Sequence, residues 1–541
     1  MQSTRLRLAA SLTSALVLLG GCGRGPSGPE GGSTFGGSVT LGLAQVGTLD
    51  PPRATGLPAL SILRTACDGL VGLEPGTDAL RPALAQHWSL SSVARVLEVQ
   101  LGENLEFQDG TPVTAGAVRE ALSRVARPAT DSPWAGLVSK IEGFEEVTSG
   151  EATSLSGVRI IDDTNLEVRL SVPASEFPTV LSHPALTPVS LESVAQNPGG
   201  VDLPVCAGPY RIETGSGEQD FRLGKVPEYS SHNEAYLNDG QGLAEVILVR
   251  AYDSAEDAYQ GYVSDEVDIA PVPDSRLAEA QAEGGMHSRS TPNVTYLGFA
   301  PVDGPTADPR VRRAISLSID RLAIIEAVYG DGRAPAERWL DPDYGVGPPE
   351  PCAQYLSRIA DPQQAQQQLA AGSVDPESPQ IPLYHSEAGR DRLVAEAVQT
   401  QVKQALGLDL KPVAVRGQSV EEAYNPEDPS VWLLSTSVEL PLPAQLLGDP
   451  FRTGGKGNVL GFADPAFDDS IHAAERSSSP EQVTRLYLEA ESRLCDVMPG
   501  IPLWRAADHW AVDTSAVSFE GNRVLGSLGF PLLRHARAGG A

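Results

Sequence analysis

Eight histidines are the residues of this chain best suited to metal binding or to general acid–base chemistry. They are spread along the sequence as His87, His183, His232, His287, His385, His472, His509 and His535. None of them forms an HExxH motif or another pair at metal-ligand spacing. We therefore expect no metal site and no bound cofactor.

Motifs for nucleophilic catalysis and for phosphate binding are also missing from the sequence. There is no G-x-S-x-G elbow and no Walker P-loop. Gly455-Lys456-Gly457-Asn458 is rich in glycine but lacks the spacing of a phosphate loop, so we interpret it as a turn. Adjacent acids such as Asp162 and Asp163 are expected by chance among 70 acidic residues, although the two carboxylates of a glycosidase need not be neighbours in sequence. The pattern favours a protein that binds over one that catalyses.

The N-terminal segment has the features of an export signal. Arg5 and Arg7 precede an apolar stretch, residues 8–19, which is too short to cross a bilayer permanently. Residues 19–22 (LGGC) then resemble the bacterial lipobox, in which the cysteine receives a lipid. We expect a signal peptide at 1–21, lipid attachment at Cys22, and a flexible linker rich in Gly, Ser and Pro up to residue 37. The alternative is an ordinary secretory signal in which the cysteine is incidental.

The remaining cysteines are even in number, as expected for disulfides formed in an oxidising compartment. They are Cys67, Cys206, Cys352 and Cys495, and four cysteines allow three pairings. Their wide, irregular spacing without a CxxC motif argues against a zinc cluster.

Length and charge restrict the class of protein further. The 541 residues exceed the roughly 250–300 that one hydrophobic core supports, so we expect two or three lobes. A net charge of −30 disfavours nucleic-acid binding. The basic cluster Arg310, Arg312 and Arg313 lies in a helical pattern, and we interpret it as a solvated helix face.

Strand and helix patterns alternate along the chain, which predicts an α/β or mixed α+β class. Alternating apolar residues predict strands at 39–43, 96–101 and 166–170. Thr114, Asp308 and Asp320 are expected to cap helices, because each precedes an apolar stripe at helical spacing. A further amphipathic helix is predicted at 393–406, ending at Gly407.

Six stretches in one order resemble the peptide/nickel class of extracytoplasmic solute-binding proteins of ABC importers. They are residues 48–51 (TLDP), 80–88 (LRPALAQHW), 107–114 (FQDGTPVT), 207–210 (AGPY), 261–270 (GYVSDEVDIA) and 308–321 (DPRVRRAISLSIDR). In the fourth stretch, Cys206-Ala207 departs from the usual Gly-Thr of that family. The resemblance spans residues 39 to 504, and its specificity lies in the order of the motifs.

The resemblance implies a two-lobed periplasmic-binding-protein-like fold with an additional inserted domain and the ligand between the lobes. Lobe I would comprise residues 38–75, 204–296 and 504–541, the inserted subdomain 76–203, and lobe II 297–503. With these boundaries the resemblance also implies the pairing Cys67–Cys206 and Cys352–Cys495, because each disulfide then stays inside one lobe.

The family resemblance also indicates candidate ligand-binding residues. In oligopeptide and dipeptide binders, an Asp in an "aDYpDP"-like segment pairs with the free amine of the peptide. The matching segment here has Ser437 at the Asp position in one register and Ser435 in another, with Glu439 close by as a possible substitute. Three aromatic residues, Trp134, Tyr296 and Trp504, match family positions that could clamp a solute, although core packing explains such residues equally well.

Together these features imply a non-enzymatic lipoprotein that captures peptides or peptide-like solutes outside the cell and delivers them to a membrane permease. The expected partners are the ABC permease and ATPase subunits and the membrane, through the lipid, with no nucleic acid and a monomeric state. One alternative is a non-peptide cargo, such as a modified peptide, glycan fragment, metal chelate or haem. Another is a sensory lipoprotein that presents its ligand to a receptor.

Overall fold

The structure is a computed structural model of the chain. The residues it describes are 38–74, 79–197, 199–215, 217, 220–227, 229, 244–330, 332–340, 349–373, 380–387, 389–425, 427–436, 438, 440, 442–455, 457–514, 517–518 and 534–535. Cys22, Ser437 and Glu439 therefore lie outside the described residues, as do the signal peptide and the linker.

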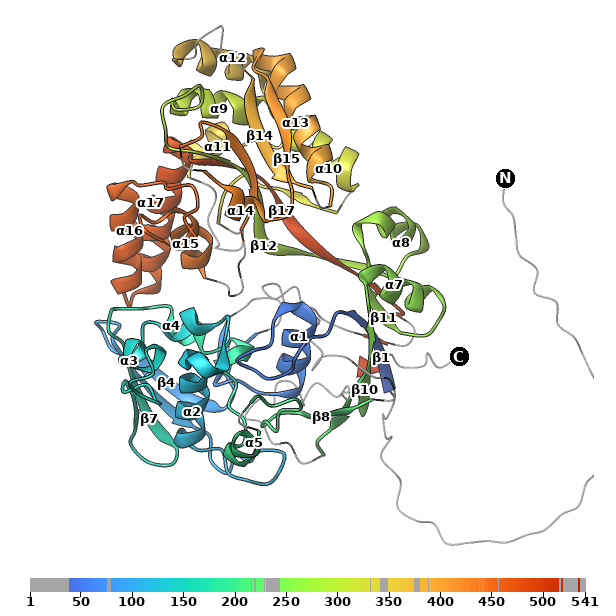
Figure 1. Ribbon diagram of the computed structural model, residues 1–541, viewed down its shortest axis with the longest axis vertical. Helices are drawn as coiled ribbons and strands as arrows, with labels where there is room; N and C mark the ends of the chain where they lie inside the picture. The colour runs from blue at the N-terminus through green and yellow to red at the C-terminus, as the bar shows by residue number, and fades with distance from the viewer. Residues whose placement is uncertain are drawn as a thin grey trace, which may run out of the picture. The chain divides into compact units, whose positions relative to one another are not determined.

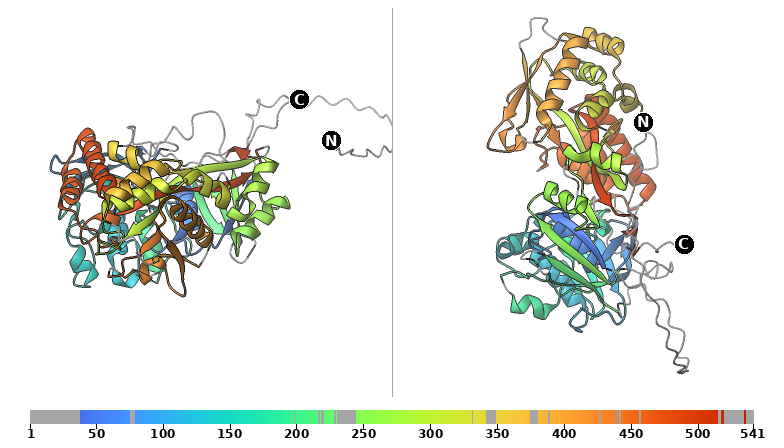
Figure 2. Two further views of the ribbon diagram at one scale, coloured as in Figure 1. Left: turned by 90° about the horizontal axis from the view of Figure 1, so that it is seen from above. Right: turned by 90° about the vertical axis from the view of Figure 1, so that its right-hand side faces the viewer.

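One large mixed sheet organises the described residues (Figure 1). Its strands, in spatial order, are β15 (Leu410–Val415), β14 (Ile381–Ser386), β16 (Val431–Ser435), β12 (Met286–Phe299), β17 (Gly500–Val512), β11 (Ile269–Pro271), β1 (Ser38–Ala44), β10 (Val246–Tyr252), β9 (Phe221–Lys225) and β8 (Tyr210–Thr214), with β13 (Ala334–Pro335) paired to β17. The parallel neighbours β1 and β10 lie side by side, blue and green, in the right-hand view of Figure 2.

Two long antiparallel strands, β12 and β17, connect two hydrophobic cores. The first core contains most of the buried apolar residues between Val39 and Ile269, and the second contains those between Val294 and Trp504. Val294, Tyr296 and Leu297 are all buried, so β12 is covered on both faces where it enters the second core. The sheet is therefore continuous while the apolar packing is divided.

The first core also packs against a smaller sheet, β4 (Ala85–Leu90), β5 (Val96–Leu101), β7 (Asn165–Arg169) and β6 (Val158–Ile160). Its main helices are α1 (Gly56–Ala66) and α2 (Ala115–Ala126). Thr114 caps α2 as predicted, because its hydroxyl accepts a hydrogen bond from the Ala117 amide at 3.3 Å. Asp50, in the TLDP stretch, forms a buried ion pair with Arg124 of α2 at 3.0 Å, which fixes the loop after β1.

The second core is built from β14 to β16 and the helices that cover them. These helices are α9 (Pro309–Ser318), α10 (Arg321–Tyr329), α12 (Pro362–Ala371), α13 (Asp391–Leu406), α16 (Pro465–Arg476) and α17 (Pro480–Val497). The predicted caps form here too: Asp308 accepts from the Arg310 amide at 2.9 Å and Asp320 from the Ala323 amide at 2.9 Å. Gly407, with a φ of +74°, ends α13 in the left-handed conformation that favours glycine.

The remaining short elements connect these layers. They are α3 (Phe144–Thr148), α4 (Phe177–Val180), α5 (Leu191–Gln196), α7 (Ala255–Val263), α8 (Leu277–Glu283), α11 (Glu350–Tyr355), α14 (Val420–Ala423), α15 (Asp449–Phe451), β2 (Val71–Leu73), β3 (Leu80–Pro82), β18 (Val517–Ser518) and β19 (Arg534–His535).

Two disulfides form, and they are the pairs that the resemblance implied. Cys67 bonds to Cys206 with a Cα–Cα distance of 5.5 Å, and Cys352 bonds to Cys495 with a distance of 5.0 Å. Cys67 and Cys206 belong to the first core, whereas Cys352 and Cys495 belong to the second. Neither covalent link joins one core to the other.

The two cores also meet away from the crossing strands, at α16. The amide of Ser175, just before α4, donates to the carbonyl of Glu475 at 3.0 Å. The Glu475 carboxylate pairs with Lys140 at 3.0 Å and with Arg452 at 3.3 Å. This contact joins a segment between the first-core residues Ala174 and Phe177 to a helix of the second core.

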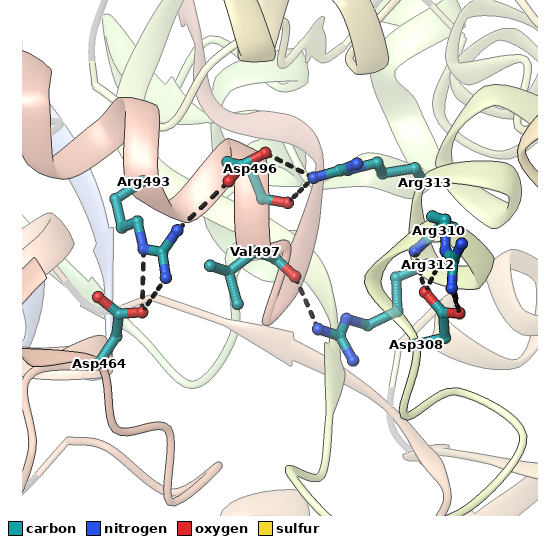
Figure 3. Close-up of polar contacts among 8 residues, drawn as sticks. All are labelled: Asp308, Arg310, Arg312, Arg313, Asp464, Arg493, Asp496 and Val497. Atoms are coloured by element: carbon teal, nitrogen blue, oxygen red, sulfur yellow. Dashed lines mark hydrogen bonds and ion pairs between the residues drawn. The ribbon is translucent and has the colours of Figure 1, made fainter. Parts of the chain in front are cut away.

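The basic cluster of α9 corrects our interpretation of a solvated face (Figure 3). Arg312 is buried, and its guanidinium donates to the carbonyls of Thr306, Ala307 and Val497 at 2.7, 2.8 and 2.7 Å. Arg313 pairs with Asp496 at 2.6 Å. Burial lowers the pKa of Arg312 to about 10, which still leaves it charged at neutral pH. The cluster holds α9 against the end of α17.

Candidate functional site

A cavity of about 350 Å³ opens at the carboxyl ends of the parallel strands β1 and β11. Leu43 and Ala44 end β1, and Pro271 ends β11. The helices that follow β1 and β10 contribute Leu57 and Ala255 from their first turns. In open α/β sheets, ligands bind outside the carboxyl ends of the strands, so this cavity is the candidate site.

The cavity combines apolar walls with a small set of ionisable groups. The lining residues are Leu43, Ala44, Leu57, Pro58, Ser61, Ala255, Pro271, Val272, Pro273, Asp274, Arg333, Ala507, Asp508, His509 and Trp510. A volume of this order accommodates a small solute, and a few polar groups in an apolar pocket are typical of binding sites.

Arg333 is the cation among the described residues that line the cavity, and its ion-pair partner is Asp274. Its guanidinium pairs with Asp274 at 3.1 Å and packs over the ring of Tyr329, 4.7 Å from the ring centre. The positive charge of Arg333 also lowers the pKa of Asp508, but burial outweighs it and raises the pKa of that carboxyl to about 6. Among the described residues, the Oδ2 atom of Asp508 has no hydrogen-bond partner.

His509 is held as a neutral imidazole. Its Nε2 lies 3.1 Å from the carbonyl oxygen of Gly332, which can only accept, so Nε2 carries the proton. Its Nδ1 lies 2.8 Å from the Ser288 hydroxyl and accepts from it. Burial lowers the pKa of His509, which keeps the ring neutral at pH 7.

Two carboxylates, Asp274 and Asp508, and one cation, Arg333, line the cavity, and the neutral His509 adds no charge. A second cation, Arg390, lies beside them and donates to the carbonyl of Asp274. These charges balance, so any selectivity for a charged solute would come from the contacts of each group and not from a net charge. Within the described residues, no group of three or more His, Cys, Asp or Glu side chains is placed to hold a metal ion.

Three of the predicted ligand-binding residues come together around β12. Thr295 of β12 pairs with Ser435 on one side and with Trp504 on the other, and Tyr296 is its neighbour in sequence. Ser435 is exposed, and its hydroxyl lies 3.2 Å from that of Thr295. Tyr296 and Trp504 are 4% and 1% exposed, so both are packed inside the second core.

Trp134 lies in a different environment, within the first core. Its indole Nε1 donates to the carbonyl of Ala54 at 2.7 Å, and its ring packs 4.5 Å from that of His183. None of the four described candidates, Trp134, Tyr296, Ser435 and Trp504, lines the cavity. Their role in ligand contact stays a prediction, and Ser435 is the one of the four that is exposed.

The described residues next to Ser437 and Glu439 are anchored to β12. The Thr436 amide donates to the Val294 carbonyl at 2.9 Å, and the Thr436 hydroxyl accepts from the Val294 amide at 2.8 Å. The Val438 amide donates to the Asn293 side chain at 2.7 Å. This segment is therefore held beside the strand that connects the two cores.

The residues of the cavity were missed by the sequence analysis. Asp274, Arg333, Asp508 and His509 come from three separate segments, and no spacing rule links them. One signal was available: Asp508 and His509 follow two alanines within a strand that is otherwise largely apolar. A carboxylate in such a strand needs either a hydrogen-bonding or charged partner, or contact with a cavity, because burying a charge without one is costly.

Comparison with known families now assigns the chain. Residues 79–458 match the family described as "Bacterial extracellular solute-binding proteins, family 5 Middle". The chain belongs to this family. These solute-binding proteins of ABC transporters are non-enzymatic, which confirms the expectation of a protein that binds without catalysing.

The relatives of this solute-binding protein span most of its length. Periplasmic murein peptide-binding protein MppA of Escherichia coli (strain K12) is 26% identical over 472 residues, which cover 85% of each chain. Dipeptide-binding protein DppE of Bacillus subtilis (strain 168) is 25% identical over 481 residues, covering 84% of each. Probable deoxycholate-binding periplasmic protein YgiS of Escherichia coli (strain K12) is 30% identical over 306 residues, covering 55% of each.

The fold of the solute-binding protein also matches a solved structure. The unliganded open form of MppA superimposes with a TM-score of 0.81 at 23% sequence identity, covering 92% of this chain and 97% of that one. The mixed α/β, two-lobed architecture expected from the sequence is thereby confirmed. Among the described residues, no helix is both long enough and apolar enough to span a bilayer.

Proposed function

We propose that this solute-binding protein is a lipoprotein, anchored through Cys22 on the extracytoplasmic face of the cell membrane, that captures peptides or peptide-like solutes. It delivers them as a monomer to the permease and ATPase subunits of an ABC importer. The observation that carries the proposal is the similarity to MppA and DppE over more than four-fifths of each chain, since both are named for peptide binding. The cavity, with its apolar walls and a few ionisable groups, is our candidate for the site of such a solute.

The proposed domains follow the sequence assignment. Lobe I comprises residues 38–75, 204–296 and 504–541, the inserted subdomain 76–203, and lobe II 297–503. Support comes from the second core, whose buried members begin at Val294 and end at Trp504. Closure of the lobes on a ligand requires the closed state to bind it more tightly than the open state does.

Binding of peptides is tested first on the protein as purified. Native mass spectrometry identifies any retained cargo, and thermal-shift titrations with dipeptides and oligopeptides measure stabilisation. A ligand present at about 100 times its Kd raises the free energy of unfolding by about 2.7 kcal/mol, which gives a clear rise in melting temperature. If no peptide raises the melting temperature and no peptide is retained, the peptide proposal fails.

A non-peptide cargo is the second candidate, and one observation favours it. The two registers of the ligand-binding segment place Ser437 or Ser435, not a carboxylate, at the position of the family's Asp. A buried ammonium without a charged partner is costly, so a cargo without a free amine becomes plausible unless Glu439 or another acid substitutes. The same screen, extended to bile acids, glycan fragments, metal chelates and haem, separates the two candidates.

A further inference from the structure

The cavity contains a carboxylate that the fold leaves without a partner, and this feature goes beyond the family assignment. Asp508 lies on β17, in a stretch flanked by β12 and β11. Its Oδ2 atom is buried without a hydrogen-bond partner among the described residues, while the residue as a whole is half-buried and lines the cavity. Leaving a charged oxygen in this state costs free energy that a bound cation would recover.

The other ionisable groups of the cavity are already satisfied. Arg333 is engaged by both oxygens of Asp274, at 3.3 and 3.1 Å, and donates to the carbonyl of Ala507 at 3.2 Å. Both ring nitrogens of His509 are occupied, by Ser288 and by Gly332. Arg390 lies close by but uses its guanidinium on the carbonyls of Asp274 and Val328. Among the described side chains that line the cavity, Asp508 is therefore the ionisable group whose buried oxygen has no hydrogen-bond partner.

We propose that Asp508 is the specificity-determining anchor for a primary ammonium group of the solute, bound in the cavity at the carboxyl ends of β1 and β11. The ammonium would donate to the Asp508 carboxylate in a charge-assisted hydrogen bond. The aliphatic part of the solute would lie against the apolar wall formed by Leu57, Val272 and Pro273. The inference rests on the proposed function, because it takes the cavity as the solute site.

The anchor explains how the protein can recognise an amine although both serine registers lack the family's Asp. Asp508 lies four residues after Trp504 on the strand that connects the two cores. A cation bound there would lie beside β17, its neighbour β11 and the segment that carries Arg333, which leads into β13. An ammonium of this kind is supplied either by the α-amine of a peptide or by the side chain of a lysine, and the two sources call for different probes.

The test compares the wild type with Asp508→Asn, which keeps the shape of the side chain and removes its charge. The exposed Asp163→Asn is the matched control. The peptide probes, measured by calorimetric titration at pH 7.5, are trialanine, N-acetyltrialanine and N-acetyl-Ala-Lys-Ala. A second pair, n-butylamine and 1-pentanol, compares an ammonium with a neutral molecule of similar size by thermal shift.

In the wild type and in Asp163→Asn, we expect at least one peptide with a free amine to have a Kd about tenfold or more below that of N-acetyltrialanine. In Asp508→Asn, we expect this difference in Kd to vanish. Tight binding of trialanine identifies the α-amine as the source, and tight binding of N-acetyl-Ala-Lys-Ala identifies the side-chain amine. A variant that keeps the preference overturns the anchor but leaves the proposed function standing. If the wild type binds no peptide, the proposed function fails, and the role of Asp508 is then tested with the amine pair alone. The role of Asp508 is supported if n-butylamine raises the melting temperature of the wild type more than 1-pentanol does and this difference is lost in Asp508→Asn. Any other result with this pair overturns it.

Discussion

At the scale of single residues, burial shifts the pKa values of the ionisable groups in the cavity. Asp508 has its pKa raised from 3.8 to about 6 because burial disfavours its ionised form, and Arg333 offsets only part of that effect. Among the described side chains, Asp274, Arg333, Arg390 and His509 are the ionisable groups around it, and His509 stays neutral. Arg289 lies opposite Asp508 in the register of β12 and β17. The ionised carboxylate of Asp508 thus lowers the free energy of unfolding at neutral pH, and a purely structural role would not explain why it is there.

That cost predicts a gain of stability on removing the charge. Because the folded pKa lies above the unfolded one, protonation stabilises the fold fully below about pH 3.8, and this contribution is lost as the pH rises through about 6. We expect Asp508→Asn to raise the free energy of unfolding at pH 7.5 by about 1–3 kcal/mol, and by much less at pH 4.5. Chemical denaturation at both pH values measures the difference. A variant that is less stable than the wild type at pH 7.5 contradicts this account.

Residue-level reasoning from the sequence had mixed success for the site. The cysteine pairs were predicted through the family resemblance, whose lobe boundaries place each pair inside one lobe, and both pairs form. The cavity was not predicted, since Asp274, Arg333 and Asp508 are brought together only by the order of strands in the sheet. Trp504 and Tyr296 were identifiable as aromatic positions, but their burial depends on neighbours far away in sequence.

At the scale of elements, local chemistry determined where helices begin and end. Thr114, Asp308 and Asp320 were predicted as caps, and their side chains accept the expected amide hydrogen bonds. The interpretation of the basic cluster of α9 as a solvated face holds for Arg310, which is exposed, and was wrong for Arg312, which is buried. The apolar stripe of α9 is real, but α12, α13 and the end of α17 pack around several sides of it, which encloses Arg312 as well. Periodicity predicts one buried face and cannot reveal a second.

The buried Arg312 gives a prediction about how α9 and α17 are held together. Arg312→Leu would leave the carbonyls of Thr306, Ala307 and Val497 without their donor, so we expect a loss of about 2–4 kcal/mol in the free energy of unfolding. Arg310→Ala is the control, because Arg310 is exposed in its pair with Asp308, and it should cost less than about 1 kcal/mol. Equal losses in urea denaturation of the two variants would exclude an anchoring role for Arg312.

At the scale of the whole molecule, we expect the contact at α16 to respond to pH. Glu176, the residue just before α4, has its pKa raised to about 7, chiefly because of burial, with Glu475 and Asp449 adding to the rise and Tyr487 and Lys140 opposing it. Its Oε1 atom has no hydrogen-bond partner among the described residues. Protonation of Glu176 should therefore strengthen the contact between the two cores.

The pH at which this contact weakens can be predicted. A raised folded pKa means that the stabilisation is fully present below about pH 4.5 and is lost as the pH rises through about 7. Hydrogen exchange of residues 172–180 should be faster at pH 8 than at pH 6, after correction for the intrinsic rate, and Glu176→Gln should remove the difference. The exposed Glu151→Gln is the control. A pH dependence that survives in Glu176→Gln would assign it to another group.

The position of β17 in the sheet has a consequence for how the chain folds. β17 comes from residues 500–512, yet it lies between β12 and β11, and β11 in turn borders β1 near the start of the described chain. Until β17 is available, β11 and β12 each expose an unpaired edge. The contacts that close the sheet join residues more than 200 positions apart, as between Ile269 of β11 and Val512 of β17. A nascent chain therefore cannot complete its central sheet before residues 500–512 have been synthesised.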